Sequence, residues 1–242
     1  MINMFSQGTY ISYKKIMKKI LMMFALIGGF TFLGSDINAG NYWVNNDYYF
    51  QHNAMTYNAK NNRVQNVWMS SGIKSNSAWS SAFSDGFNSY ENKDSSGTNA
   101  RSFNLNVVST TNTNISNVDV YLVDDKNKRD VLGWVVGCVI DKNNKHVCKT
   151  EYISNANVHY YKLYINRYAH DTIIKNVDQR KKEARLTSAH EFSHTLAMGH
   201  YMTKNGNISM SVNSIMSYAD STKMNHALKT NDIKRLTNLY GK

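Results

Sequence analysis

The sequence predicts a mixed α/β fold of the α+β type, in which helices pack on a twisted mixed sheet. Several runs between residues 63 and 168 alternate apolar and polar side chains, as strands do, and three other segments repeat apolar residues at helical spacing. One helix follows the first strand, a group of strands comes next, and helices end the chain. This order favours a layered fold over 63–242 with a small C-terminal part that ends in a helix.

The predicted strands begin with 63–73, which contains Val64, Val67 and Met69. Further strands are expected at 103–109, 118–123, 132–140 and 158–168. The run 132–140 is almost continuously apolar, which is typical of a central strand whose two faces are both covered.

The first predicted helix starts near residue 75, where Ser75, Asn76 or Ser77 can cap it. Its apolar stripe consists of Trp79, Phe83, Phe87 and Tyr90. A second helix is expected at 176–197 and a last one at 231–239, with Thr230 as a plausible N-cap.

Residues 1–39 are expected to be a secretory signal peptide. Four lysines between residues 14 and 19 precede an apolar run of fifteen residues at 20–34, which is too short to span a bilayer comfortably. Cleavage is expected near Ala39, and the alternative is an uncleaved membrane anchor. Residues 40–62 are rich in Asn and Tyr and are expected to form an irregular N-terminal segment or a short pro-region.

The formal net charge is +11, of which +8 remains after the leader is removed. Such a charge can favour anionic surfaces such as a cell wall, although plain solubility explains it as well. Nucleic-acid binding fits poorly, because the chain is exported and has no recognised binding motif. We expect a secreted, extracellular monomer that does not insert stably into a membrane after cleavage.

Cys138 and Cys148 are the only cysteines, and an oxidising compartment should pair them. They lie in two apolar runs on either side of a polar turn at 142–145, so the disulfide would join neighbouring strands of a hairpin. A cysteine metal site is the weaker interpretation, because two thiols ten residues apart lack the usual close spacing.

The segment HEFSHTLAMGH at 190–200 carries the most specific chemistry in the chain. His190 and His194 are four residues apart, which places both imidazoles on one face of a helix and allows them to bind the same Zn²⁺ ion. Glu191 lies beside the first ligand, where it can act as a general base on a water molecule. His200 can be a third ligand only if the chain turns back, and Gly199 is placed to permit a turn.

A catalytic zinc site needs three protein ligands and an open position. No Glu occurs after Glu191, which excludes a layout with a later Glu ligand. The remaining candidates for the third ligand are His200, Asp220, His226 and Asp232. We favour His200, because it is close and because three neutral imidazoles are a known catalytic set.

The histidine segment resembles the metzincin signature HExxHxxGxxH. The sequence SIMSY at 214–218 is similar to the methionine turns of astacins and serralysins, and 228–241 resembles the final helix of matrixins and bacterial matrixin-like proteases. By element order the resemblance covers about 63–241, although it is sharp only in these three segments.

The resemblance implies a secreted zinc metalloendopeptidase with a twisted mixed sheet, a backing helix and an active-site helix. It implies that His190, His194 and His200 bind Zn²⁺. Met216 would form a hydrophobic floor under them, and Tyr218 would be an extra ligand or an oxyanion donor. The strand at 158–168 resembles the edge strand that binds a protein or peptide substrate by β-augmentation.

The chain departs from the family pattern at the turn, where Ala197 replaces the metzincin glycine. Alanine tolerates a positive φ less well, so we expect either that Gly199 absorbs the turn or that no positive φ is needed. The matrixin cysteine switch is absent, because no Cys lies before the catalytic region, and Asp47 or another residue in 40–62 could occupy the zinc instead. His146, His159 and His170 are expected to be surface residues, with structural zinc as the alternative.

Two other functional classes stay open. One is a zinc hydrolase that acts on a cell-wall peptide or amide. The other is a non-catalytic binding protein on a protease fold, which would have no use for Glu191 as a base.

Overall fold

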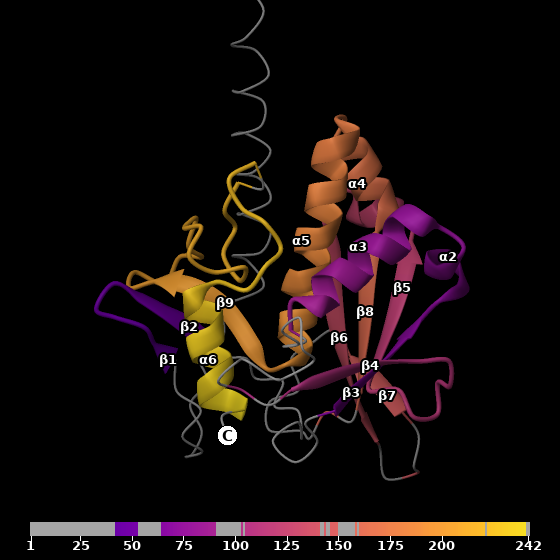
Figure 1. Cartoon of the computed structure of the whole chain (residues 1–242), viewed down its shortest axis with the longest axis horizontal. Coiled ribbons are helices and arrows are strands. Elements are labelled where there is room, and N and C mark those ends of the chain that lie inside the picture. The colour runs from indigo at the N-terminus through magenta and orange to yellow at the C-terminus, as the bar shows by residue number, and fades with distance from the viewer. Residues whose placement is uncertain are drawn as a thin grey trace, which may run out of the picture. The chain divides into compact units, whose positions relative to one another are not determined.

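A six-stranded mixed sheet forms the main layer of the computed structural model (Figure 1). The structure describes residues 42–52, 64–90, 103, 105–140, 143, 146–149, 158, 160–220 and 222–240. The sheet order is β4 (Asn106–Thr110), β3 (Val64–Met69), β5 (Val118–Val123), β8 (Tyr160–Asn166), β6 (Gly133–Ile140) and β7 (His146–Lys149). The first four of these strands are parallel, whereas β6 is antiparallel to both of its neighbours. The predicted mixed α/β class is therefore confirmed.

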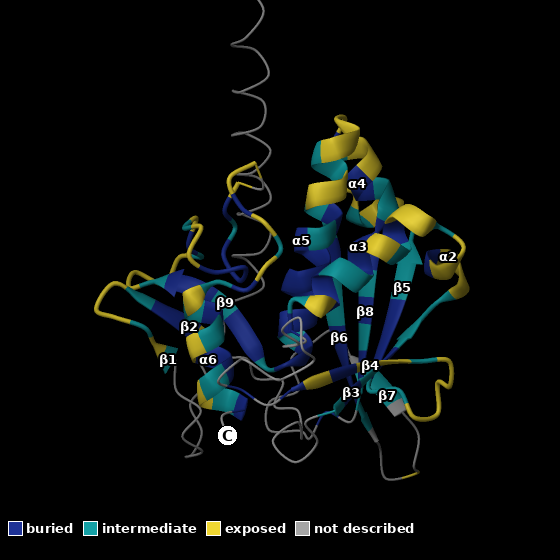
Figure 2. Ribbon diagram, viewed as in Figure 1, coloured by how far each residue is buried: buried dark blue, intermediate teal, exposed yellow. Residues whose placement is uncertain are grey.

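Two helices, α3 (Ser77–Asn88) and α5 (Val177–Thr195), lie together on one face of this sheet (Figure 1). Asn76 caps α3 by accepting from the Trp79 N–H, and Asn176 caps α5 by accepting from the Gln179 N–H. Phe192 of α5 packs its ring 4.6 Å from that of Phe87 on α3. The predicted aromatic stripe is therefore core, and Figure 2 shows that the C-terminal half of α5 is buried.

Successive side chains of β8 point to opposite faces of the sheet. Tyr161, Leu163 and Ile165 of β8 are fully buried on the helix side. On the opposite face, Tyr164 stacks between Tyr121 of β5 and Trp134 of β6, with ring centroids 5.3 and 5.0 Å apart. This alternation is the strand pattern that the sequence predicted.

The strand expected to be the edge of the sheet is an interior strand. The segment 158–168 contains β8, which pairs with β5 on one side and with β6 on the other. The prediction of an edge strand there is therefore wrong, because an alternating pattern reports which face is buried but not which strands are neighbours. The segment also ends earlier than expected, since Arg167–Ile173 form the helix α4.

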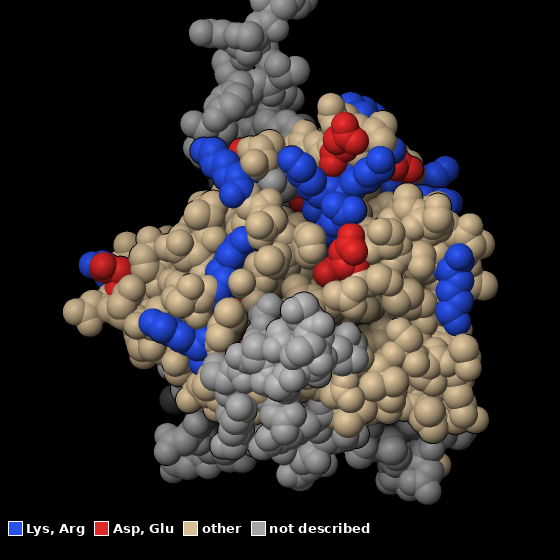
Figure 3. All heavy atoms as spheres, viewed as in Figure 1, with Lys and Arg blue, Asp and Glu red and all other residues tan. Residues whose placement is uncertain are grey.

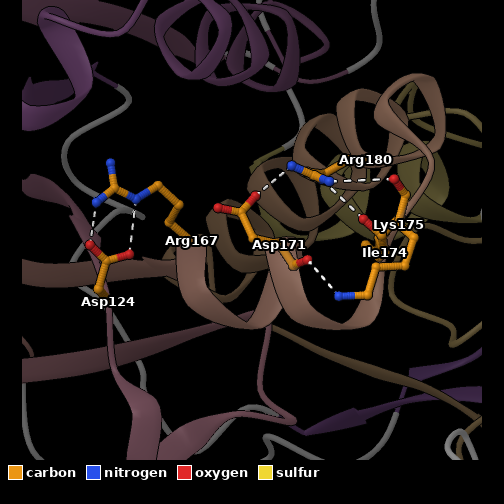
Figure 4. A network of polar contacts seen from close by, with 6 residues as sticks. All are labelled: Asp124, Arg167, Asp171, Ile174, Lys175 and Arg180. Carbon is orange, nitrogen blue, oxygen red and sulfur yellow. Dashed lines mark hydrogen bonds and ion pairs between the residues drawn. The ribbon is translucent and has the colours of Figure 1, made fainter.

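The corner between α4 and α5 is held by charged side chains, and Figure 4 shows this network. Arg180 of α5 donates to the Asp171 carboxylate at 2.7 Å and to the Ile174 carbonyl at 3.0 Å. Arg167 forms a bidentate pair with Asp124. His170 lies fully buried behind this corner with its ring edge against Trp79, so the expectation that it is a surface residue is wrong.

Basic residues of α5 have acidic partners. Lys181 lies near Asp178, and Arg185 pairs with Asp85 of α3 at 2.8 Å. On the face drawn in Figure 3, acidic and basic side chains are interspersed along this part of the surface. The charge of α5 is therefore largely neutralised locally.

A second, three-stranded sheet has the order β1 (Tyr42–Trp43), β2 (Tyr48–His52) and β9 (Met198–Thr203). All of its pairings are antiparallel. The helix α6 (Thr230–Tyr240) ends the described chain, and Leu236 and Tyr240 are buried on it as predicted. Residues 42–52 were expected to be irregular, whereas they form a hairpin, because their pairing with β9 depends on residues far along the chain.

Cys138 and Cys148 form the predicted disulfide, and they lie directly opposite each other on β6 and β7. The predicted leader and His159 lie outside the described residues, as does the side chain of His146. Within the part of the chain that is described, no helix is both long and apolar enough to cross a membrane. Short elements complete the fold, namely α2 (Ser71–Lys74) and the 3₁₀ turn η2 (Lys126–Lys128).

Candidate metal centre

Three histidines from two elements meet at the C-terminal end of α5. His190 and His194 lie on the last turns of this helix, and His200 lies on β9, which follows after a short turn. Each offers one ring nitrogen, and these nitrogens all lie within 4.8 Å of one another. Among the described residues, this is the group of His, Cys, Asp or Glu side chains that could hold a metal ion. The predicted ligand set is therefore brought together in space.

The turn between helix and strand has its positive φ at Ala197, where φ is 60°. The Ala197 N–H donates to the His194 carbonyl at 3.2 Å, which closes the end of the helix. A non-glycine residue in this left-handed region is strained by roughly 1–2 kcal/mol. The turn therefore does need the left-handed backbone, and Ala197 supplies it itself.

Gly199 has a different role from the one expected, because its φ lies outside the left-handed region. A Cβ at this position would lie 2.0 Å from the Gln51 carbonyl oxygen and 2.8 Å from its carbon. The glycine is therefore required for the close approach of β2 to β9, and the prediction that it absorbs the turn is wrong.

Backbone carbonyls orient the rings of two of the three histidines. His190 Nδ1 lies 2.7 Å from the Ile215 carbonyl oxygen, and His194 Nδ1 lies 2.9 Å from that of Met198. Since a carbonyl can only accept, the neutral rings of His190 and His194 carry their protons on Nδ1 and have the lone pair on Nε2. This is the tautomer that binds a metal through Nε2.

Burial keeps the three imidazoles neutral. It lowers the pKa of His190 to about 4 and that of His194 to about 3, and it lowers the pKa of His200 well below the usual 6.5. Neighbouring imidazoles add to the lowered pKa of His194 and His200. Neutral imidazole is the ligand form, so the ligands are ready to bind at neutral pH.

The donor set fits zinc. Tetrahedral coordination with Zn–N bonds of about 2.0–2.1 Å places the nitrogens roughly 3.3 Å apart, so separations within 4.8 Å require only small ring movements. Three neutral nitrogens, with a fourth position open, are the donor set that catalytic zinc sites use, and His190, His194 and His200 offer such a set.

Glu191 lies between the helix and β6. It is 8% exposed, and burial raises the pKa of its carboxyl to about 8. A Cβ at Gly133 of β6 would lie 2.9 Å from Glu191 Cγ and 2.9 Å from Thr187 Cγ2. Gly133 therefore makes the room that Glu191 occupies, a role that the sequence alone did not indicate.

The segment at 214–218 reaches His190 through a backbone carbonyl. Met216 is fully buried, and Ile215 before it provides the acceptor for His190 Nδ1. The Met216 carbonyl accepts from the Tyr201 N–H on β9 at 2.9 Å. The segment at 214–218 therefore contacts both ligand-bearing elements.

Asp232 supports this turn and is not a ligand. Its buried carboxylate accepts from the Ser214 hydroxyl, the Ile215 N–H and the Lys229 N–H. Burial raises its pKa to about 6. Asp220 is exposed and accepts from Thr222, so neither aspartate belongs to the three-histidine group.

Tyr218 lies beside the third histidine. Its hydroxyl is 3.3 Å from His200 Nε2, and its N–H donates to the Ser209 carbonyl. The predicted second functional side chain therefore reaches the metal-binding nitrogens. Asp47, the candidate for a latency group, instead lies in the turn of the N-terminal hairpin and pairs with Lys204 at 3.3 Å.

No protein-family model and no curated protein matches this sequence. Interpretation of the centre therefore depends on its own donors, their tautomers and the buried carboxyl group beside them.

Proposed function

We propose that this chain is a secreted zinc-dependent endopeptidase of the metzincin type. The observation that carries the proposal is the group of three neutral histidines with Glu191 directly beside the first of them. The segment 214–218 and the final helix support it, because they resemble metzincins in sequence, because 214–218 contacts His190, and because the helix contacts 214–218 through Asp232.

His190, His194 and His200 would hold the ion through ring nitrogens that lie within 4.8 Å of one another. When bound, zinc supplies a Lewis acid that polarises a carbonyl and lowers the pKa of a water molecule towards ~7. Glu191 would act as general base on the attacking water and would pass the proton to the leaving amine. Tyr218, whose hydroxyl lies 3.3 Å from His200 Nε2, would donate a hydrogen bond to the negative oxygen that develops on the substrate.

One edge of β6 has no partner at 133–136 among the described strands, and this supports an extended peptide as substrate. β6 pairs with β8 from Gly133 to Cys138, whereas β7 covers its other edge only from Gly137 onward. No described strand pairs with that edge at 133–136, and Gly133 lies next to Glu191. A peptide could therefore add as a strand beside the general base. This stretch of β6 replaces the segment that the sequence suggested.

The test is hydrolysis of a diverse peptide library by the zinc-loaded protein, with and without a chelator, followed by mass spectrometry. Glu191→Gln should bind zinc normally and lose hydrolysis by about 10²-fold or more, because it keeps the size of the side chain and removes the base. His200→Ala should lose zinc affinity as well. Unchanged peptide hydrolysis in Glu191→Gln would refute the mechanism.

The two other classes are distinguished by the same experiment. Cleavage of cell-wall amides without cleavage of any peptide would favour the alternative hydrolase. Zinc binding with no hydrolysis of either substrate would favour a binding protein on a protease fold.

A further inference from the structure

The strand that carries His200 is held along both edges. On one edge, β9 pairs with β2 through Phe50↔Tyr201 and Tyr49↔Met202. On the other edge, the Tyr201 N–H donates to the Met216 carbonyl at 2.9 Å, and the Tyr201 carbonyl accepts from the Ser209 N–H at 2.7 Å. The third ligand therefore depends on the N-terminal hairpin as well as on the methionine turn.

The pairing of β2 with β9 contains a bulge at the ligand itself. His52 pairs with Met198 and Phe50 pairs with Tyr201, so Gln51 alone lies opposite both Gly199 and His200. A bulge of this kind redirects side chains on the longer strand and is often found beside active sites. The direction of the His200 side chain is therefore set by β2, which pairs with β9 at residues before and after His200.

Side chains fix the hairpin on β9. Phe50 is fully buried, with its ring 5.0 Å from that of Tyr201. The ring of Tyr48 stacks on the same tyrosine at 5.3 Å. At the far end, the Lys204 N–H donates to the Asp47 carbonyl at 2.7 Å. The hairpin is therefore attached along the whole length of β9.

We infer that β2, residues 48–52, is a permanent part of the metal centre, which it completes by holding His200 in place. Any processing of the N-terminus has to spare this strand, so it is not part of a removable pro-region. The inference concerns metal binding and stands whether or not the protein is a peptidase.

The test measures zinc affinity by competition with a chromophoric chelator in full-chain variants. Gly199→Ala introduces a methyl group whose three nearest neighbours all belong to Gln51, so it separates β2 from β9. Phe50→Ala removes the ring that packs on Tyr201. Both should weaken zinc binding by about ten- to a hundredfold, the usual effect of losing a support of a metal ligand.

Trp43→Ala is the matched control, because Trp43 lies on the same hairpin but is 54% exposed and packs on Tyr49. It should bind zinc as the unmodified protein does. The cobalt-substituted proteins provide a second readout, because loss of one imidazole should change the visible absorption of Co²⁺ in Gly199→Ala and not in Trp43→Ala.

Hydrogen exchange of the unmodified protein keeps the inference testable if the variants fail to fold. Zinc should slow exchange of the β2 amides together with those of β9. The inference is overturned by folded Gly199→Ala and Phe50→Ala proteins with unchanged zinc affinity, by zinc protection of β9 without β2, or by a purified zinc-binding chain that begins after residue 52.

Discussion

Replacing Ala197 with glycine should stabilise the protein. Ala197 has φ of 60°, a conformation that costs a non-glycine residue roughly 1–2 kcal/mol. Glycine removes this cost but gives the unfolded chain more freedom, which offsets about 0.4–1 kcal/mol. The expected net gain in the free energy of unfolding is therefore about 0.5–1 kcal/mol, or a rise in Tm of roughly 1–4 °C for a domain of this size.

The assay is urea and thermal unfolding in the presence of a chelator, so that metal binding does not contribute. Ala78→Gly is the control, because Ala78 is exposed on α3 and has an ordinary helical backbone. It should lose up to about 1 kcal/mol. If Ala197→Gly loses as much stability as Ala78→Gly, the strain assigned to this turn is wrong.

Two further substitutions test the interior and the disulfide. Burial, with a smaller contribution from Arg180, lowers the pKa of His170 from 6.5 to about 3. Between pH 6.5 and pH 3, His170 is therefore protonated in the unfolded chain but neutral in the folded protein. The stabilisation from this neutral imidazole is complete above pH 6.5 and is lost by about 1.4 kcal/mol per pH unit as the pH falls towards 3. In urea unfolding at about pH 7 and pH 5, His170→Leu should therefore lose less stability on acidification than the unmodified protein, and equal losses would contradict the assignment. Cys138→Ala combined with Cys148→Ala should lower the free energy of unfolding by about 2–3 kcal/mol, because the disulfide closes a short loop. A change below about 0.5 kcal/mol would show that the disulfide adds little stability.

Much of the fold was predictable from interactions between residues that are close in the sequence. The helix at 176–197 follows from a capping Asn176 and from apolar spacing, and α5 spans Val177–Thr195. The strand predicted at 118–123 has the bounds of β5. The spacing of His190 and His194 fixes their common face, because it depends only on the pitch of a helix.

Features that depend on distant pairing could not be read in this way. The partner strands of β8 and the hairpin at 42–52 involve residues far apart in the sequence, for which periodicity carries no signal. The role of Gly133 is of the same kind, because it becomes visible only when β6 lies against Glu191. The prediction that Gly199 absorbs the turn was wrong for this reason, because a side chain at this position is excluded by the Gln51 backbone.

The peptide group between Ile215 and Met216 joins the last helix to a metal ligand by way of Ser214. Its C=O accepts from His190 Nδ1 at 2.7 Å, its N–H donates to the Ser214 hydroxyl at 3.0 Å, and that hydroxyl donates to Asp232. Hydrogen bonds in such a chain polarise one another, so negative charge on Asp232 increases the electron density on the Ile215 oxygen. That oxygen then draws the Nδ1 proton more strongly and makes Nε2 of His190 a better electron donor. A carboxylate on α6 thus acts on the basicity of a ligand through one hydroxyl and one amide group.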